Sequence, residues 1–111
     1  MIATAREYAD FLIAVSRGQI LRKDTVVRMW TRQSLADGSL VPFSTLGWAT
    51  GVRGTDRYVT HGGMQPGTTA VMHWFPEAGA GSVILCNAEG PALDALQEEI
   101  LKVLLNPYFR R

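Results

Sequence analysis

The sequence has 111 residues but only one cysteine, two histidines and no excess of either charge. A single thiol, Cys86, excludes an internal disulfide, a redox pair of thiols and a cysteine-based structural zinc site. Eleven Lys and Arg residues balance ten Asp and Glu residues, for a formal net charge of +1. No global field therefore favours nucleic acid or anionic lipid as a partner.

Long apolar runs are also missing from the sequence. None approaches the roughly 20 residues that a membrane-spanning helix needs. Arg6, Glu7 and Asp10 interrupt the N-terminal stretch, where a signal peptide would be continuously apolar. We expect this chain neither to span a membrane nor to carry its own export signal, and the sequence indicates no compartment.

The composition that is present is that of a folded domain. Hydrophobic residues make up 47% of the chain and charged residues 19%, which is opposite to the signature of disorder. A length of 111 residues suits one domain with one core.

The first helix is predicted by its cap. Thr4 and Glu7 have the spacing of a capping box, in which each side chain accepts a hydrogen bond from the backbone of the other. The pattern predicts a helix over residues 5–17, stopped by Gly18. Its apolar stripe consists of Tyr8, Phe11, Leu12 and Val15.

The remaining elements alternate with turn signals. Asp24 is suited to cap a second helix over residues 24–31, and residues 32–45 are typical of a loop. From there, short β-rich runs predict an antiparallel meander. The predicted strands are 46–52, 57–62, 68–75 and 82–87. Pro91 is suited to the first position of a final amphipathic helix over residues 91–105.

The last predicted strand contains the continuous apolar run Val83-Ile84-Leu85-Cys86. Such a run is typical of a strand that is covered on both faces. The predicted fold class is therefore α+β, an antiparallel sheet of about four strands with helices packed on it.

The two histidines, His61 and His73, do not indicate a metal site, because no acidic residue stands at ligand spacing beside them. We expect no metal and no cofactor. His73, within a predicted strand, is interpreted as an ordinary half-buried or surface histidine. His61 precedes Gly62-Gly63, which indicates either a bulge or strand end, or a strand edge that another backbone or a ligand approaches closely.

Familiar nucleophile motifs are absent. The sequence contains no G-x-S-x-G, no S-x-x-K and no phosphate-binding glycine loop. Tyr8-Ala9-Asp10 has only a superficial likeness to Tyr-x-Asn, and we expect Tyr8 to pack in the core. Cys86 is expected to be buried and inert.

Five segments stand in a recognisable order along the chain: 4–12, Leu46-Gly47-Trp48, 61–67, Phe75-Pro76-Glu77 and 83–87. Their order resembles the C-terminal part of the class C β-lactamase-related serine hydrolases, which include penicillin-binding D-alanyl-D-alanine carboxypeptidases, esterases and D-aminopeptidases.

The resemblance implies roles for four residues. His61-Gly62-Gly63 corresponds to the K-[ST]-G or H-x-G element on the strand that borders the active site in that family. His61 would place positive character or a hydrogen bond near the acyl end of the substrate, and Gly62 and Gly63 would bind substrate by leaving room at the strand edge. The backbone amide of Met64 would help to form the oxyanion hole.

The resemblance also implies what lies outside the chain. The catalytic S-x-x-K and Tyr-x-Asn elements of the family are absent here, so we expect a single partial domain, 1–111, that is inactive alone. Its partner would be the N-terminal part of the same fold or a second copy, which would also cover the edge of the last strand. The complemented enzyme would hydrolyse an ester, an amide or a β-lactam through an acyl-enzyme. Gly62 lacks the hydroxyl with which many relatives bind a carboxylate, which favours ester or peptide substrates.

A different class of function stays open. The chain could be a free-standing, non-catalytic domain that binds a peptide or protein at the sheet edge near residues 61–67. A well-behaved monomer would favour this hypothesis, and association through the edge of the last strand would favour the fragment hypothesis.

Overall fold

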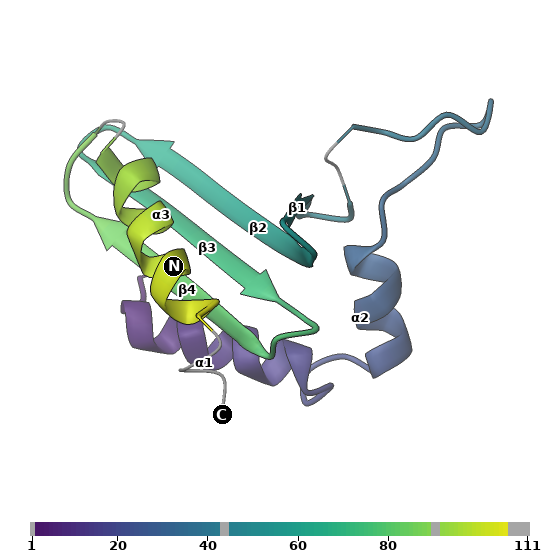
Figure 1. Ribbon diagram of the computed structural model, residues 1–111, viewed down its shortest axis with the longest axis horizontal. Helices are drawn as coiled ribbons and strands as arrows, with labels where there is room; N and C mark the ends of the chain where they lie inside the picture. The colour runs from purple at the N-terminus through teal and green to yellow at the C-terminus, as the bar shows by residue number, and fades with distance from the viewer. Residues whose placement is uncertain (1, 43–44, 90–91, 107–111) are drawn as a thin grey trace.

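The computed structural model describes residues 2–42, 45–89 and 92–106 (Figure 1). Two helices come first, then four strands, then a last helix. They are α1 (Ala5–Ser16), α2 (Lys23–Trp30), β1 (Ala49–Arg53), β2 (Asp56–Gln65), β3 (Thr68–Phe75), β4 (Ala80–Cys86) and α3 (Ala92–Leu104). The predicted α+β class is confirmed. No helix among these residues is both long enough and apolar enough to span a bilayer.

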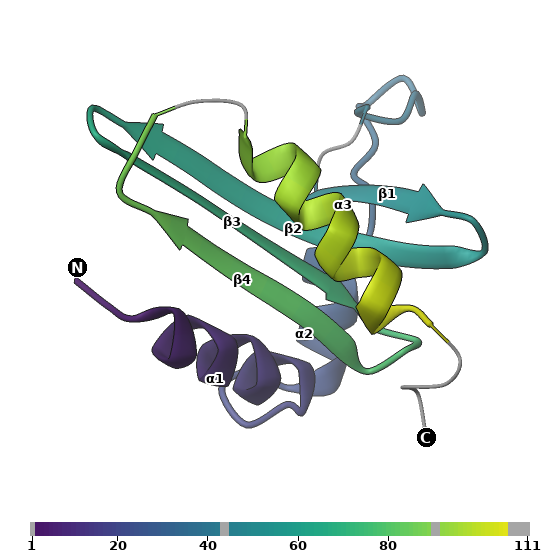
Figure 2. The same cartoon turned by 60° about the vertical axis from the view of Figure 1, so that its left-hand side comes forward.

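The strands form one antiparallel sheet in the order β1-β2-β3-β4. Figure 2 shows α3 crossing one face of the sheet, while α1 runs alongside β4 toward the opposite face. Strand β4 pairs only with β3 among the described strands, so it is an edge strand whose outer side has α1 as its neighbour.

Helix α1 begins where its cap predicts. The Glu7 amide donates to Thr4 Oγ1 at 3.2 Å, and the Thr4 amide donates to the Glu7 carboxylate at 2.6 Å. The helix ends at Ser16, and Gly18 follows in the left-handed conformation with φ of 73°. The predicted stripe is wrong for one of its members, because Phe11 is 42% exposed and lies outside the core.

Helix α2 begins one residue before the predicted range, without the predicted cap. Its N-cap is Arg22, which makes no capping hydrogen bond through its side chain. Asp24 lies instead in the first turn, where its carboxylate accepts hydrogen bonds from the Arg22 guanidinium. A carboxylate in the first turn still favours the helix through its dipole.

Strand boundaries differ from the prediction at three of the four strands. β1 starts at Ala49 rather than at 46, because Gly47 turns the chain with φ of 79°. β2 runs from Asp56 to Gln65, beyond the predicted end at 62. β4 spans Ala80–Cys86 rather than 82–87, whereas β3 has the predicted bounds. Helix α3 covers 92–104 of the predicted 91–105, and its expected first residue, Pro91, lies outside the described residues.

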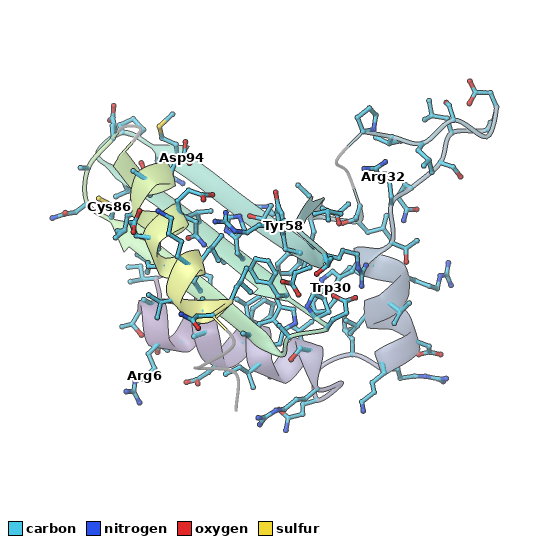
Figure 3. The ribbon with its side chains drawn as sticks, in the orientation of Figure 1. Arg6, Trp30, Arg32, Tyr58, Cys86 and Asp94 are labelled. Carbon is cyan, nitrogen blue, oxygen red and sulfur yellow. The ribbon has the colours of Figure 1, made fainter. Side chains whose placement is uncertain are left out.

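The main core fills the space between α1, α2 and one face of the sheet. Its buried members are Leu12, Val15, Val26, Trp30, Val59 and Trp74. Figure 3 shows Trp30 between α2 and the sheet. On the other face, Phe75 is fully buried, and Leu93 and Leu101 of α3 are also buried.

The helices on the two sides of the sheet do not cover β4 completely. Ile84 is buried, but Leu85 is 39% exposed. The expectation that the whole apolar run is covered is therefore wrong at Leu85. Side chains of neighbouring strand residues point to opposite faces, and Leu85 faces a groove rather than packed side chains.

Candidate active site

Strand β2 is longer than the strand beside it. Pairing with β1 begins at Ala49↔Thr60, whereas pairing with β3 continues from Val59 through Gln65. The segment His61–Gln65 therefore has one hydrogen-bonding edge that no described strand occupies. His61-Gly62-Gly63 lies inside this regular strand, so the interpretation as a bulge or strand end is wrong.

The two hairpins of β2 determine which of its amides face the open edge. Arg53↔Asp56 and Gln65↔Thr68 each close a two-residue loop, and such closing pairs exchange backbone hydrogen bonds. Alternation along the strand then directs the odd-numbered residues toward β3 and the even-numbered residues toward β1. The backbone N–H groups of Gly62 and Met64 consequently point to the open edge.

Beside this edge lies a small apolar groove of about 210 Å³. It is lined by residues of α1, β2, β3 and β4, namely Tyr8, His61, Gly62, Gly63, Ala70, Val71, Met72, Val83 and Leu85. The imidazole of His61 is its one basic group. His61 is exposed, and its ring meets that of Trp48 edge-on, with centroids 6.4 Å apart.

The two glycines after His61 differ in the space around them. A Cβ at Gly62 would lie 3.1 Å from the carbonyl oxygen of Ala70, which is a tight contact. A Cβ at Gly63 would have no heavy atom within 4 Å. Gly63 therefore leaves open room at the groove, and any side chain there would occupy it.

A wider cavity of about 790 Å³ adjoins the groove at the β2–β3 hairpin. Met64 and Cys86 both contribute to its wall, and the two cavities share Tyr8, Gly63, Ala70 and Leu85. The Met64 side chain is 69% exposed. Cys86 is half-buried rather than enclosed, so the expected full burial of its thiol is not found.

Tyr8 is the residue of this groove that the sequence pattern assigned elsewhere. It is half-buried and lines the groove together with His61, instead of belonging to the buried cluster around Leu12 and Val15. One sequence feature could have indicated this position. Tyr8 stands at the N-terminal end of the apolar stripe, where a tyrosine can keep its hydroxyl accessible.

His73 takes no part in this groove. It pairs with Thr60 and Ser82, on the sheet face opposite to that of His61. Its ring packs against Tyr58 with centroids 5.2 Å apart (Tyr58 is labelled in Figure 3). Burial lowers the pKa of His73, as expected for a half-buried sheet histidine. Among the described residues, no cluster of His, Cys, Asp and Glu could hold a metal ion.

Comparison with known proteins identifies the family. The chain matches the model of the β-lactamase family over residues 1–106. No curated protein and no solved structure gives a significant match. The match covers both helices before the sheet, all four strands and α3, including the groove and the open edge of β2. The chain therefore belongs to the β-lactamase family.

Proposed function

We propose that this chain forms the strand wall of the acyl-transfer site in a serine hydrolase of the β-lactamase-related class. The observation that carries the proposal is the position of the Met64 amide. It points to the unpaired edge of β2, three residues from His61, which lines the adjoining groove.

In this proposal the Met64 N–H is one donor of an oxyanion hole. A donor of this kind stabilises the charge that develops on the substrate oxygen and is worth about 3 kcal/mol. Gly62 presents the next outward amide, two residues and about 7 Å along the strand. One oxygen cannot accept from both amides, so the second donor belongs to the segment that carries the nucleophile.

The nucleophile belongs to another segment of polypeptide, because none of the five serines in this sequence begins an S-x-x-K element. The serine Oγ of that segment attacks the substrate carbonyl carbon and loses its proton to the neighbouring base. The bond to the leaving group breaks as the leaving group takes up a proton, and water then hydrolyses the acyl-enzyme. We propose that the N-terminal part of the same fold supplies this serine and that the chain alone is inactive.

The groove favours a small substrate with an uncharged acyl group. Its wall is mostly apolar, its volume is about 210 Å³, and Gly63 places no side chain over it. Position 62 also offers no hydroxyl to a substrate carboxylate. Esters and amides therefore fit this wall better than β-lactams do.

The test is complementation. The 111-residue chain is mixed with a polypeptide that carries the S-x-x-K and Tyr-x-Asn elements of the family, and a fluorophosphonate probe and p-nitrophenyl acetate report acylation and turnover. The mixture should react and neither part alone should do so. Labelling of the 111-residue chain alone, or a mixture whose rate is unaffected by His61→Ala, would overturn the proposal.

A matched pair of variants isolates the amide. Met64→Pro removes the N–H from an unpaired strand edge, where proline is tolerated, and Met64→Ala keeps the N–H. The proline variant should lose roughly 10²- to 10³-fold in kcat. The alanine variant should keep its kcat. Equal rates for both variants would remove Met64 from the proposed oxyanion hole.

The open edge also supports a second candidate function. An extended peptide could pair with the outward groups of Gly62 and Met64 and place side chains in the groove, as in strand addition. A panel of immobilised peptides tests this function in the 111-residue chain alone. Micromolar binding that Met64→Pro abolishes and Met64→Ala preserves would favour this function over catalysis.

A further inference from the structure

We infer that Trp48 is a positioning residue for His61. The inference rests on the proposed function, since it concerns the direction in which the His61 imidazole is held. Trp48 immediately precedes β1, so the register Ala49↔Thr60 places it opposite His61 on the same sheet face. The two rings meet at 81° with centroids 6.4 Å apart, an edge-to-face arrangement.

His61 has few other neighbours that could orient its ring. It is exposed, Gly62 and Gly63 follow it without side chains, and β1 ends before reaching it. Its partner on the β3 side is Met72, a flexible thioether. The indole of Trp48 is thus the one rigid side chain in ring contact with His61 among the described residues.

Trp48 is itself held in place by the core. Its ring meets that of Trp30 at 79° with centroids 5.9 Å apart, and Trp30 is only 5% exposed. Its carbonyl accepts hydrogen bonds from the backbone N–H and the hydroxyl of Thr45, at 2.8 and 2.9 Å. Thr45 is buried, and the next amide, that of Leu46, donates to the Met29 carbonyl of α2 at 3.1 Å.

A continuous set of contacts therefore leads from α2 through Trp48 to His61. Holding a reacting side chain in one orientation before the substrate arrives avoids the entropy of ordering it during the reaction, and a misplacement of about 1 Å can cost a hundredfold in rate. Trp48 does not line the groove, so its effect on catalysis would act through His61.

The direct test uses the fact that the chain has only two histidines. Each packs against a different aromatic ring, His61 against Trp48 and His73 against Tyr58. In NMR spectra of the 111-residue chain, Trp48→Leu should move the His61 ring signals to the position of a solvent-exposed histidine and leave those of His73 in place. Tyr58→Leu should have the reverse effect. Trp48→Phe should keep part of the displacement of the His61 signals, since it retains an aromatic ring.

An unchanged His61 signal in Trp48→Leu would overturn the inference. If Trp48→Leu unfolds the chain, the His73 signals will also move. The same comparison is then made with Trp48→Phe. A His61 signal nearer to the exposed position, with His73 unchanged, supports positioning. A His61 signal identical to that of the wild type overturns it.

Kinetics of the complemented enzyme separate this inference from the proposed function. Trp48→Leu should lower kcat for p-nitrophenyl acetate about ten- to a hundredfold while KM stays within a factor of about two. If His61→Ala lowers kcat and Trp48→Leu does not, positioning is wrong and the function stands. If no mixture turns over ester while the NMR result holds, the contact between the rings stands and the proposed function fails.

Discussion

The guanidinium of Arg53 on β1 lies 2.6 Å from both carboxylate oxygens of Glu98 on α3. One ion pair thus joins two segments that are 45 residues apart in sequence. Helix α3 has a second polar contact with the sheet, where Gln97 Nε2 donates to Ser82 Oγ at 2.7 Å. The position of α3 therefore depends on polar groups as well as on its buried leucines.

This ion pair predicts acid sensitivity. The hydrogen bond from Arg53 lowers the pKa of Glu98 below its usual value. The folded state then binds fewer protons than the unfolded state, so the stabilisation is present above the ordinary glutamate pKa and is lost as pH falls through the folded pKa. Glu98→Gln should reduce the loss of stability below about pH 4.3, as measured by urea unfolding.

Glu99→Gln is the matched control for that experiment. Glu99 is the next residue of α3 and carries the same charge, but its partner is Lys102 on the same helix, at 2.5 Å. An equal change in acid sensitivity for both variants would show that the contact between β1 and α3 is not the cause.

His73 predicts a second loss of stability at a milder pH. Burial lowers its pKa; Glu98 and Asp94 oppose that effect and Arg53 reinforces it. Since the unfolded state takes up the proton first, stability should fall as pH drops below about 6.5. His73→Leu should flatten the stability profile between neutral pH and pH 5. An NMR titration midpoint for the His73 ring at or above that of free histidine would contradict the prediction.

Two glycines of the sheet should respond in opposite ways to the same substitution. A Cβ at Gly81 would lie 2.5 Å from the carbonyl oxygen of His73 and 2.6 Å from Cε3 of Trp74, whereas Gly63 has open space. Gly81→Ala should destabilise the chain by about 1–3 kcal/mol through overpacking. Gly63→Ala should be neutral or stabilising by up to about 1 kcal/mol. Thermal unfolding of both variants measures the contrast, and equal shifts would contradict it.

Two valines offer a similar contrast for the core. Val59 is fully buried in the centre of the sheet, while Val52 is 69% exposed on β1. Val59→Ala removes packed methyl groups and should cost about 2 kcal/mol. Val52→Ala should cost less than about 1 kcal/mol, which reflects strand propensity alone. Denaturant midpoints compared at constant m-value test the difference.

Local signals predicted the elements whose causes are local. The capping box of Thr4 and Glu7 marks the first helix because its hydrogen bonds join residues three positions apart. The β3 strand has its predicted bounds because Pro66-Gly67 and Pro76 interrupt the chain on either side of it. The prediction that Phe11 is buried was wrong, because helical periodicity does not show how far the apolar face of α1 reaches over the sheet.

The site was only partly predictable for the same reason. His61, Gly62, Gly63 and Met64 could be singled out from sequence and family resemblance, and their catalytic roles remain predictions. The sequence indicated a strand edge near residues 61–67, but not what leaves that edge open. The open edge depends on where β1 starts, and that start depends on the turn at Gly47 and on contacts of Thr45 with Trp48. Tyr8 joins the groove through the placement of α1 beside β4, which is a tertiary relationship.

The segment His61–Gln65, where β2 extends beyond β1, also affects how the sequence of this chain can diverge. The donor at its outer edge is a peptide group, and every amino acid except proline supplies one there. The side chain of Met64 is therefore free to vary while the amide persists. Distant relatives could keep the same backbone N–H at this strand edge while sharing almost no side chains around it. The difference in length between β1 and β2 would then identify such relatives more reliably than the identity of their residues.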